Sequence, residues 1–475
     1  MKDIYENPLC GRYASLKMQK IFSQDNKFST WRKLWVSLAE NERKLGISIT
    51  QEQIDELKAH VDDIDYSKAD GYERELRHDV MAHIRAYGDV CPTAKGIIHL
   101  GATSCYVDDN GDIIVYREGL LEIKSKLVGA LSALRDFALN NKDVPTLAYT
   151  HFQAAQPTTV GKRATLWAQD LLMDLEDLDR LIAELRFPGC KGATGTAASF
   201  LNLFDGDVDK TLALEKAIAK DFGFEKTMRV AGQTYTRKVD YRILSVLSGI
   251  AQSASKFAGD IRLLSHLKEI DEPFESKQVG SSAMAYKRNP MRSERIASLS
   301  RYVISDAINP AFTTASQWLE RSLDDSANRR ISIPEAFLAV DGILILYRNV
   351  ISGCTVYPAM CLRHIKEELP FMATENIMMT AVKKGGDRQE LHEKVREIST
   401  KAARQAKLEG KDVDILEDVL AEPAFGLTRY ELEEILDVKK FVGIAPKQTE
   451  IFIKELDGVL NANKEFLAQA ETVKC

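Results

Sequence analysis

Three long stretches of apolar residues, spaced three or four positions apart, constrain the fold of this chain most strongly. Each stretch lasts roughly 20 to 30 residues, and this spacing places one apolar stripe along one face of an α-helix. Helices of this length with one apolar stripe pack into bundles, so we expect an all-α fold whose leftover apolar surface suits contacts between subunits. The stripes comprise Leu120, Leu127, Leu131 and Leu134; Leu171, Leu175, Leu178, Ile182 and Leu185; and Ile243, Leu247, Ile250, Ala254, Phe257, Ile261 and Leu264.

Composition narrows the class of protein. The chain has 475 residues but only 13 prolines, which favours long helices. A net charge of −6 disfavours a nucleic-acid partner, and no apolar run approaches the roughly 18 residues that span a bilayer. Seven cysteines without a CxxC pair are typical of reduced thiols, and the first residues lack the apolar core of a secretion signal. We therefore expect a cytoplasmic protein with no nucleic-acid or membrane partner.

Turn-forming residues divide the chain into three predicted regions. Asp108-Asp109-Asn110-Gly111 predicts a break before the long helices, and Pro358 and Pro370 mark a change to shorter elements. The predicted organisation is an N-terminal helical domain over 1–111, a central long-helix bundle over 112–364 and a C-terminal helical domain over 365–475. The chain shows neither the βαβ alternation of a parallel sheet nor an internal repeat.

The segment from Gly280 to Asn289, GSSAMAYKRN, is the richest in reactive groups. Its small residues can present several backbone N–H groups in one direction, an arrangement suited to a carboxylate or an oxyanion. Lys287 adds a positive charge and Asn289 an amide donor. On these grounds the segment is either an anion-binding loop with a candidate hydroxyl base or a merely solvated loop.

The spacing of this segment resembles a family signature. G-S-x-x-M-x-x-K-x-N resembles the signature of the fumarase/aspartase superfamily, and Gly280, Ser281, Met284, Lys287 and Asn289 occupy its fixed places. Within that superfamily, further segments resemble the eukaryotic-type adenylosuccinate lyase family. They are RHDVMAH (77–83), GIIHLGATSCYV (96–107), THFQAAQPTTVGKR (150–163), GQTYTRK (232–238), LDDSANRR (323–330) and ELPFMATENIMM (368–379). One position departs from the signature, since Ala285 stands where proline is usual, and we expect this to alter loop kinetics at most.

The resemblance implies a β-elimination. The implied enzyme removes fumarate from adenylosuccinate, giving AMP, and from the succinyl-carboxamide ribotide of purine biosynthesis. This chemistry needs an acid, a base and fixed donors around a carboxylate, and it requires no metal or organic cofactor. By resemblance His151 is the general acid, Ser281 the general base and His78 a second active-site histidine. Ser282 is the rival hydroxyl for the base.

The same resemblance implies residues that bind a nucleotide carrying a phosphate and two carboxylates. Arginine suits such groups because its planar guanidinium makes bidentate contacts. It also implies a homotetramer in which each active site takes residues from three chains. The expected substrate-binding residues are Arg12, Tyr13, Arg77, Asp79, Thr103, Ser104, Gln233, Lys287, Asn289, Arg295, Arg321, Ser326 and Arg330.

Alternative readings have less support in the sequence. Argininosuccinate lyase, fumarase and aspartase would use a similar serine loop but need no phosphate pocket. A non-catalytic protein on the same scaffold would have lost reactive groups, yet His78, His151 and Ser281 are present. The segment 192–196, GATGT, lacks the G-x-G-x-x-G spacing of a dinucleotide site. His78 and His83 lack the spacing of a helical zinc pair, and Cys354, Cys361 and His364 lack a fourth ligand, so no metal is expected.

Overall fold

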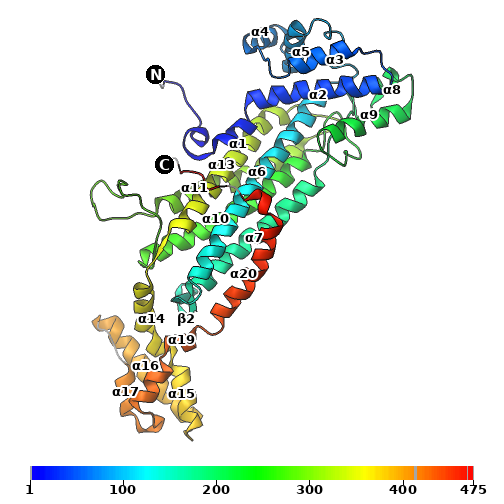
Figure 1. Cartoon of the computed structure of the whole chain (residues 1–475). Coiled ribbons are helices and arrows are strands. Elements are labelled where there is room, and N and C mark those ends of the chain that lie inside the picture. Colours follow the sequence, from blue (N-terminus) through cyan, green and yellow to red (C-terminus); the bar gives the residue numbers. More distant parts are fainter. Residues whose placement is uncertain (1–2, 411–414, 468, 474–475) are drawn as a thin grey trace.

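The computed structural model describes residues 3–410, 415–467 and 469–473 of an elongated, almost entirely helical molecule (Figure 1). The predicted all-α class is confirmed. Long helices run along the middle of the molecule and smaller helices cover both ends. The N-terminal elements are η1 (Leu9–Tyr13), α1 (Leu16–Ile21), α2 (Gln24–Lys44), α3 (Gln51–Ala59), α4 (Tyr66–Leu76) and α5 (Asp79–Val90).

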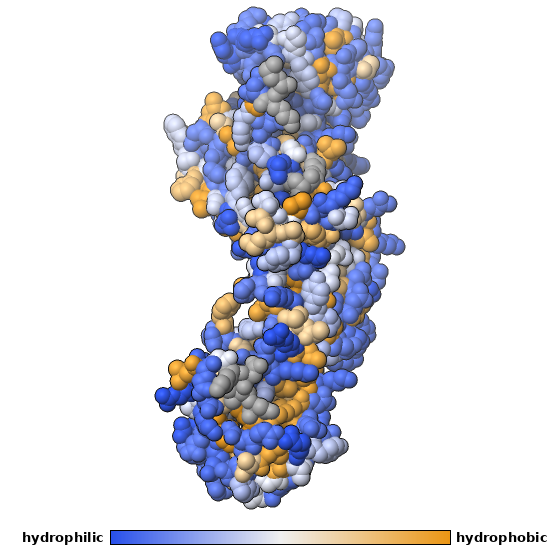
Figure 2. Space-filling model, turned by 90° about the vertical axis from the view of Figure 1, so that its left-hand side faces the viewer, coloured by the Kyte–Doolittle hydropathy of each residue, from blue (hydrophilic) through white to orange (hydrophobic). Residues whose placement is uncertain are grey.

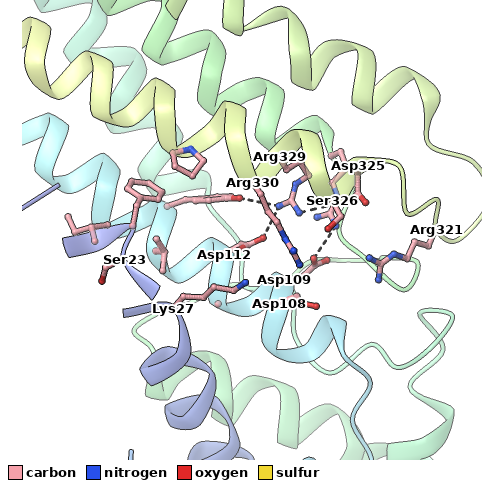
Figure 3. A pocket seen from close by; sticks show the side chains of 17 residues that line it. Ser23, Lys27, Asp108, Asp109, Asp112, Arg321, Asp325, Ser326, Arg329 and Arg330 are labelled. Atoms are coloured by element: carbon pink, nitrogen blue, oxygen red, sulfur yellow. Dashed lines mark hydrogen bonds and ion pairs between the residues drawn. The ribbon is translucent and has the colours of Figure 1, made fainter. Parts of the chain in front are cut away.

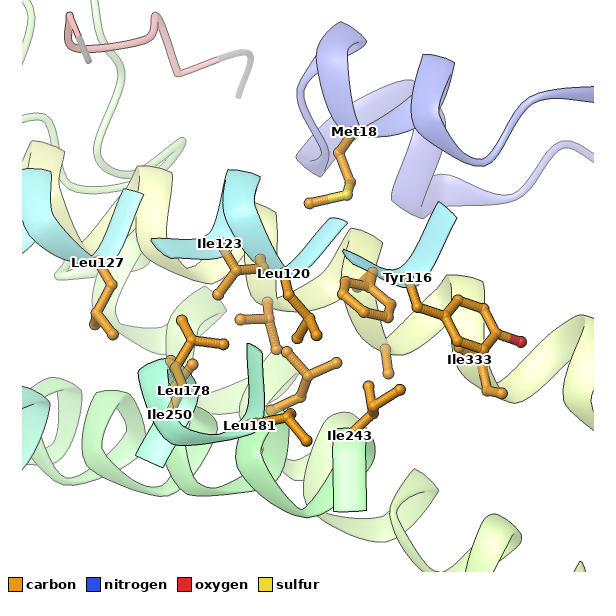
Figure 4. Packing of buried hydrophobic residues seen from close by; sticks show 14 of the residues in the cluster. Met18, Tyr116, Leu120, Ile123, Leu127, Leu178, Leu181, Ile243, Ile250 and Ile333 are labelled. Atoms are coloured by element: carbon orange, nitrogen blue, oxygen red, sulfur yellow. The ribbon is translucent and has the colours of Figure 1, made fainter. Parts of the chain in front are cut away.

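The central bundle contains the helices predicted from the apolar stripes. Two small helices, α8 (Ala198–Leu203) and α9 (Val208–Asp221), lie beside the N-terminal end of the bundle. The central helices are α6 (Cys105–Asn140), α7 (Val160–Glu184), α10 (Lys238–His266), α11 (Met291–Asp306), α12 (Ile308–Ser316) and α13 (Asp325–Gly353). The stripes meet in one continuous core, shown in Figure 4, which includes Leu120, Ile123 and Leu127 of α6, Leu178 and Leu181 of α7, and Ile243 and Ile250 of α10.

Helix α13 lies in the middle of this bundle. Among the described residues it is the one helix long and apolar enough to cross a membrane, and 72% of its most apolar window is buried inside the protein. Burial of that kind is the mark of a core helix, because its apolar side chains already contact other helices. Figure 2 shows that apolar residues nevertheless reach the surface over parts of the face drawn there.

The C-terminal part divides into two pieces. The first, which we call the C-terminal unit, spans residues 358–441 and has a core of its own, while a second small cluster joins it to Leu147 of strand β1 (Pro145–Thr150). It consists of α14 (Pro358–Met372), α15 (Thr374–Lys383), α16 (Arg388–Glu409), α17 (Ile415–Ala421), η2 (Pro423–Phe425), α18 (Arg429–Ile435) and α19 (Val438–Phe441). The second piece, α20 (Ala445–Ala462) followed by η3 (Lys464–Phe466), returns along α6 and α7 (Figure 1).

Two of the sequence predictions about boundaries are wrong. The predicted break at Asp108–Gly111 lies inside α6, because Asp109 and Asn110 bond to distant backbone groups instead of forming a turn. Asn110 accepts the N–H of Gly189 at 2.8 Å, and Asp109 accepts that of Tyr235 at 2.9 Å. The boundary at 364 falls inside α14, and the region after it includes α20, which belongs to the bundle by its packing.

In the part of the chain that the structure describes, four short strands form two antiparallel pairs. The pair of β1 (Pro145–Thr150) and β2 (Gln153–Thr159) is a hairpin between α6 and α7. Its two turn residues, His151 and Phe152, both have left-handed backbones, with φ of 51° and 59°. The twist of such a two-residue turn matches that of the flanking strands, which explains this conformation in residues other than glycine. The second pair, β3 (Ile270–Asp271) and β4 (Thr355–Val356), joins the end of α10 to the start of α14.

Candidate active site

A charged pocket of about 180 Å³ lies where the first turns of α13 and α6 face α1 and α2 (Figure 3). Lys27, Arg321 and Arg330 bring positive charge to it, and Ser326 adds a hydroxyl. Three predicted binding residues, Arg321, Ser326 and Arg330, therefore line one cavity. The positive charges of Arg321 and Arg330 can hold an anionic group such as a phosphate.

The floor of this pocket is a layer of buried arginines and carboxylates. Arg237 donates to Asp325 at 2.6 Å and to Asp109 at 3.1 Å, joining the start of α13 to α6. Arg329 donates to Asp240 of α10 at 2.6 Å and to Asp112 of α6 at 3.0 Å. Buried charges persist only when they are paired in this way, so the layer fixes three helices relative to one another.

The carboxyl group of Asp108 has an unusual environment beside this layer. Burial and the neighbouring negative charges of Asp79 and Asp112 raise its pKa to about 7, although Lys27 acts in the opposite direction. The pKa of Arg329 is raised well above its ordinary value, because its carboxylate partners outweigh burial. The pocket thus contains permanently charged arginines and one carboxyl group that titrates near neutral pH.

His78 lies at the N-terminus of α5, next to this pocket. Its Nδ1 accepts the N–H of Met81 at 3.3 Å, and its Nε2 lies 3.2 Å from Oγ of Ser104. Because Nδ1 accepts a hydrogen bond, the neutral ring carries its proton on Nε2, where it can donate to Ser104. Asp79 accepts from Arg330 at 2.9 Å. Burial raises the pKa of Asp79, but Lys27, the Val80 N–H and Arg330 together hold it below its ordinary value.

Gln233 and Arg321 connect His78 and its neighbours to the loop before α13. Arg321 donates to Oε1 of Gln233 at 2.9 Å, and the backbone N–H of Gln233 donates to the carbonyl of Glu320 at 3.0 Å. Gly232 has no room for a side chain, since a Cβ atom there would lie 2.3 Å from that carbonyl oxygen. Thr103 and Gln233 line a small neighbouring cavity together. The structure therefore brings His78, Asp79, Thr103, Ser104, Gln233, Arg321, Ser326 and Arg330 into one region.

The other predicted binding residues do not line this pocket, although Arg77 directly precedes His78 in the chain. Tyr13, in η1, packs on Gly342 in the middle of α13, and Arg12 precedes it; neither lines the pocket. Gly342 is about 18 Å along the helix from Arg330 at 1.5 Å per residue. Arg77 ends α4 with a left-handed backbone and an exposed side chain, and Arg295 lies in α11.

The loop from Gly280 to Asn289 bonds mainly to itself. Oγ of Ser281 accepts the N–H groups of Ala283 and Met284 at 3.3 and 3.1 Å, which favours the anionic form of this hydroxyl. Asn289 donates to the carbonyl of Gly280 at 2.8 Å, so its amide braces the loop. Gly280 is required there, because a Cβ atom would lie 2.0 Å from the carbonyl oxygen of Lys287. Residues 282–288, Lys287 among them, are exposed.

One chain does not bring its three predicted catalytic residues together. Ser104 lies at the start of α6 with His78 beside it, whereas the hairpin with His151 follows the end of α6. A helix of 36 residues is about 54 Å long. Within the described residues, neither His151 nor Ser281 shares a hydrogen bond or ion pair with the residues around His78.

Comparisons with known proteins identify the family of this chain. A lyase family model matches residues 31–305, and a model of the adenylosuccinate lyase C-terminus matches residues 370–452. The adenylosuccinate lyase of Saccharomyces cerevisiae is 50% identical over 472 residues, which cover 98% of this chain and 97% of that protein. The chain belongs to the adenylosuccinate lyase family. The adenylosuccinate lyase of Schistosoma mansoni is 46% identical to this chain, and the match covers 98% of this chain and 97% of that protein.

Solved structures extend the likeness to the fold. A fumarate lyase from Mesorhizobium sp. BNC1 superposes with a TM-score of 0.79 at 21% identity, covering 95% of this chain and 99% of that chain. A 3-carboxy-cis,cis-muconate lactonizing enzyme from Pseudomonas putida gives a TM-score of 0.80 at 22% identity, covering 97% and 100%. The adenylosuccinate lyase family membership also makes the chain a carbon–nitrogen lyase.

Several polar residues that line the pocket of this adenylosuccinate lyase family member were not predicted from the sequence. Lys27, Asp108 and Asp112 line the cavity, yet each looks like a surface charge on an amphipathic helix. Arg329 and Arg330 are adjacent in sequence, but only Arg330 is exposed, since neighbouring helical residues point about 100° apart. The family segments GQTYTRK and LDDSANRR were the available signal for Arg237 and Arg329.

Proposed function

We propose that this enzyme eliminates fumarate from adenylosuccinate, giving AMP, and from the succinyl-carboxamide ribotide of purine biosynthesis. The observation that carries the proposal is the pocket beside His78, in which Arg321, Arg330 and Ser326 can receive a phosphate or a carboxylate. Its occurrence in a chain 50% identical to a named adenylosuccinate lyase supports this substrate class over smaller substrates.

Ser281 is the proposed base and His151 the proposed acid. Ser281 removes the proton from the carbon next to a succinyl carboxylate, and the negative charge spreads onto that carboxylate. The carbon–nitrogen bond then breaks, and His151 gives a proton to the departing nitrogen. The two backbone N–H groups at Oγ of Ser281 support its role, because they stabilise an alkoxide. Lys287 on the same loop supplies a nearby positive charge.

The active unit in this proposal is a homotetramer with shared sites. The separation of His151 from His78 along α6 supports it, as does the exposed apolar surface of α12, the following loop and the second turn of α13. Large apolar surfaces of this kind on a folded chain mark interfaces. The exposed residues there are Ile308, Phe312, Trp318, Leu319, Leu323 and Ile331. The free thiols of the described cysteines fit the proposed cytoplasmic location.

An ultraviolet assay of the purified protein tests the proposed function. Adenylosuccinate, argininosuccinate, aspartate and malate serve as parallel substrates, and Ser281→Ala as the control. We expect turnover of adenylosuccinate alone, lost in the variant. Turnover of argininosuccinate instead would contradict the assignment of the arginine pocket. A Ser281→Ala protein as active as the wild type would contradict the assignment of the base.

A further inference from the structure

The hairpin that carries His151 is buried at its base and exposed at its tip. Thr146 and Leu147 on β1 are 0% and 2% exposed, whereas Phe152 at the turn is 78% exposed. A side chain presented at such a tip depends on how firmly the base is held. The contacts of Thr146 and Leu147 therefore decide where His151 lies.

Glu269, between α10 and β3, is the buried polar group at this base. It is 1% exposed, and its two carboxylate oxygens serve different elements. Oε2 accepts from Oγ1 of Thr146 in the hairpin at 3.0 Å, while Oε1 lies 2.8 Å from Nδ1 of His364 in α14. Its backbone carbonyl accepts the N–H of Tyr357 at 2.8 Å, just before α14.

Arg163 and an apolar cluster complete the junction. Arg163 of α7 donates to the carbonyl of Leu147 at 2.7 Å and to Oγ1 of Thr146 at 3.3 Å. The side chain of Leu147 is buried with Ile365 and Leu369, both on α14. Helix α14 thus packs directly on the hairpin through Leu147, and Glu269 links it to the hairpin a second time by bonding both His364 and Thr146.

We propose that Glu269 is a positioning residue that fixes the His151 hairpin to the C-terminal unit. The C-terminal unit then has a function in catalysis without touching substrate, since it holds the acid-bearing hairpin at the angle that a neighbouring copy requires. This inference rests on the proposed role of His151. Misplacing a catalytic group by about 1 Å can lower a rate by about 10²-fold, so loosening this junction should lower kcat.

Steady-state kinetics of the full-length enzyme with adenylosuccinate test the inference. We expect Glu269→Ala to lower kcat by about 10²-fold with KM changed by roughly twofold at most. Glu269→Gln, which keeps the shape and one acceptor, restores part of this loss. His364→Ala removes the bond between Glu269 and α14, keeps the packing of Leu147 on α14, and lowers kcat by about tenfold. The control Asp457→Asn removes a carboxylate that pairs α20 with Arg135 at 2.9 Å, and it leaves kcat unchanged.

A double-variant cycle separates positioning from general weakening of the fold. If Glu269 acts through His151, then Glu269→Ala lowers the rate of wild-type enzyme but adds no loss in the His151→Ala background. Equal losses in both backgrounds would overturn the inference, as would an unchanged kcat in His364→Ala. Should Glu269→Ala fail to fold, Thr146→Val removes the same hydrogen bond with little change in volume. A fully active His151→Ala enzyme would instead overturn the proposed function.

Discussion

The pocket beside His78 and the loop that carries Ser281 are built in opposite ways. The pocket rests on buried, paired charges from three helices, with Arg237 and Arg329 bonded to four carboxylates. The loop is exposed, and its described hydrogen bonds are largely internal, from Asn289 to Gly280 and from Ala283 and Met284 to Ser281. Substrate can therefore meet a preformed binding surface, whereas the group that we assign as base lies on a segment free to move.

The largest expected effect comes from substitutions in the exposed segments, the Ser281 loop and the tip of the His151 hairpin. Ser281→Ala and His151→Ala should each lower kcat by about 10³- to 10⁴-fold, because each removes a proton-transfer group, while thermal stability stays the same. Turnover of adenylosuccinate and thermal unfolding measure the two quantities. Neither side chain supports the core, so a drop in melting temperature would contradict this view of the loop and hairpin tip.

Mixing the two inactive variants tests whether sites are shared between chains. Because His151 lies the length of α6 from the residues around His78, a site needs more than one copy in the proposed assembly. Dissociated and reassociated mixtures of His151→Ala and Ser281→Ala should regain activity. Activity that never returns, although each variant still assembles, would contradict shared sites.

The next largest effect is expected when the buried layer of charges beneath the pocket is disrupted. Arg329→Met removes the charged partner of the buried Asp240, which keeps only the hydrogen bond from Tyr235 among its described bonds, and we expect a loss of about 3 to 5 kcal/mol in the free energy of unfolding. The adjacent Arg330→Met is the matched control. Arg330 is 60% exposed, so its loss should change stability by no more than about 0.5 kcal/mol while raising KM for the nucleotide. Chemical denaturation compares the free energies of unfolding of the two variants. Equal destabilisation would contradict the difference between the buried Arg329 and the exposed Arg330.

A smaller effect concerns the pH dependence of the pocket. The pKa of Asp108 is about 7 in the folded protein, against 3.8 as its ordinary value. A raised carboxyl pKa gives stability that is fully present below the unfolded pKa and is lost as pH rises through about 7. Asp108→Asn should thus come close to the wild type near pH 4 and be more stable at pH 8, by at most about 4 kcal/mol if the whole shift of roughly 3 pKa units is expressed. Thermal unfolding across this range measures it; an identical profile for both proteins would contradict the assignment.

The sequence predicts the bundle better than the site. Apolar residues such as Leu178 and Ile250 keep their helical spacing in the core, so periodicity was sufficient for α7 and α10. The break at Asp108–Gly111 was mispredicted because its polar residues bond to groups far away in sequence, which no local signal reports. The same reason hides Arg237 and Glu269, whose importance lies in partners 88 and 95 positions away. The roles of the site residues came from the family resemblance. The structure adds that, within one chain, His151 lies far from the residues around His78.

The smallest expected effect concerns Ala285, which stands where the signature usually has proline. Its side chain is exposed, and the loop is braced elsewhere by Gly280 and Asn289, so proline should fit without displacing a buried group. Proline would restrict the free loop and reduce the entropy lost on closure by a few tenths of a kcal/mol, up to about 1 kcal/mol. We expect Ala285→Pro to change kcat or KM by less than about fivefold, measured beside Ala285→Gly, which should shift the same parameter in the opposite direction. Parallel shifts in the two variants would mean that Ala285 acts through its side chain and not through loop mobility.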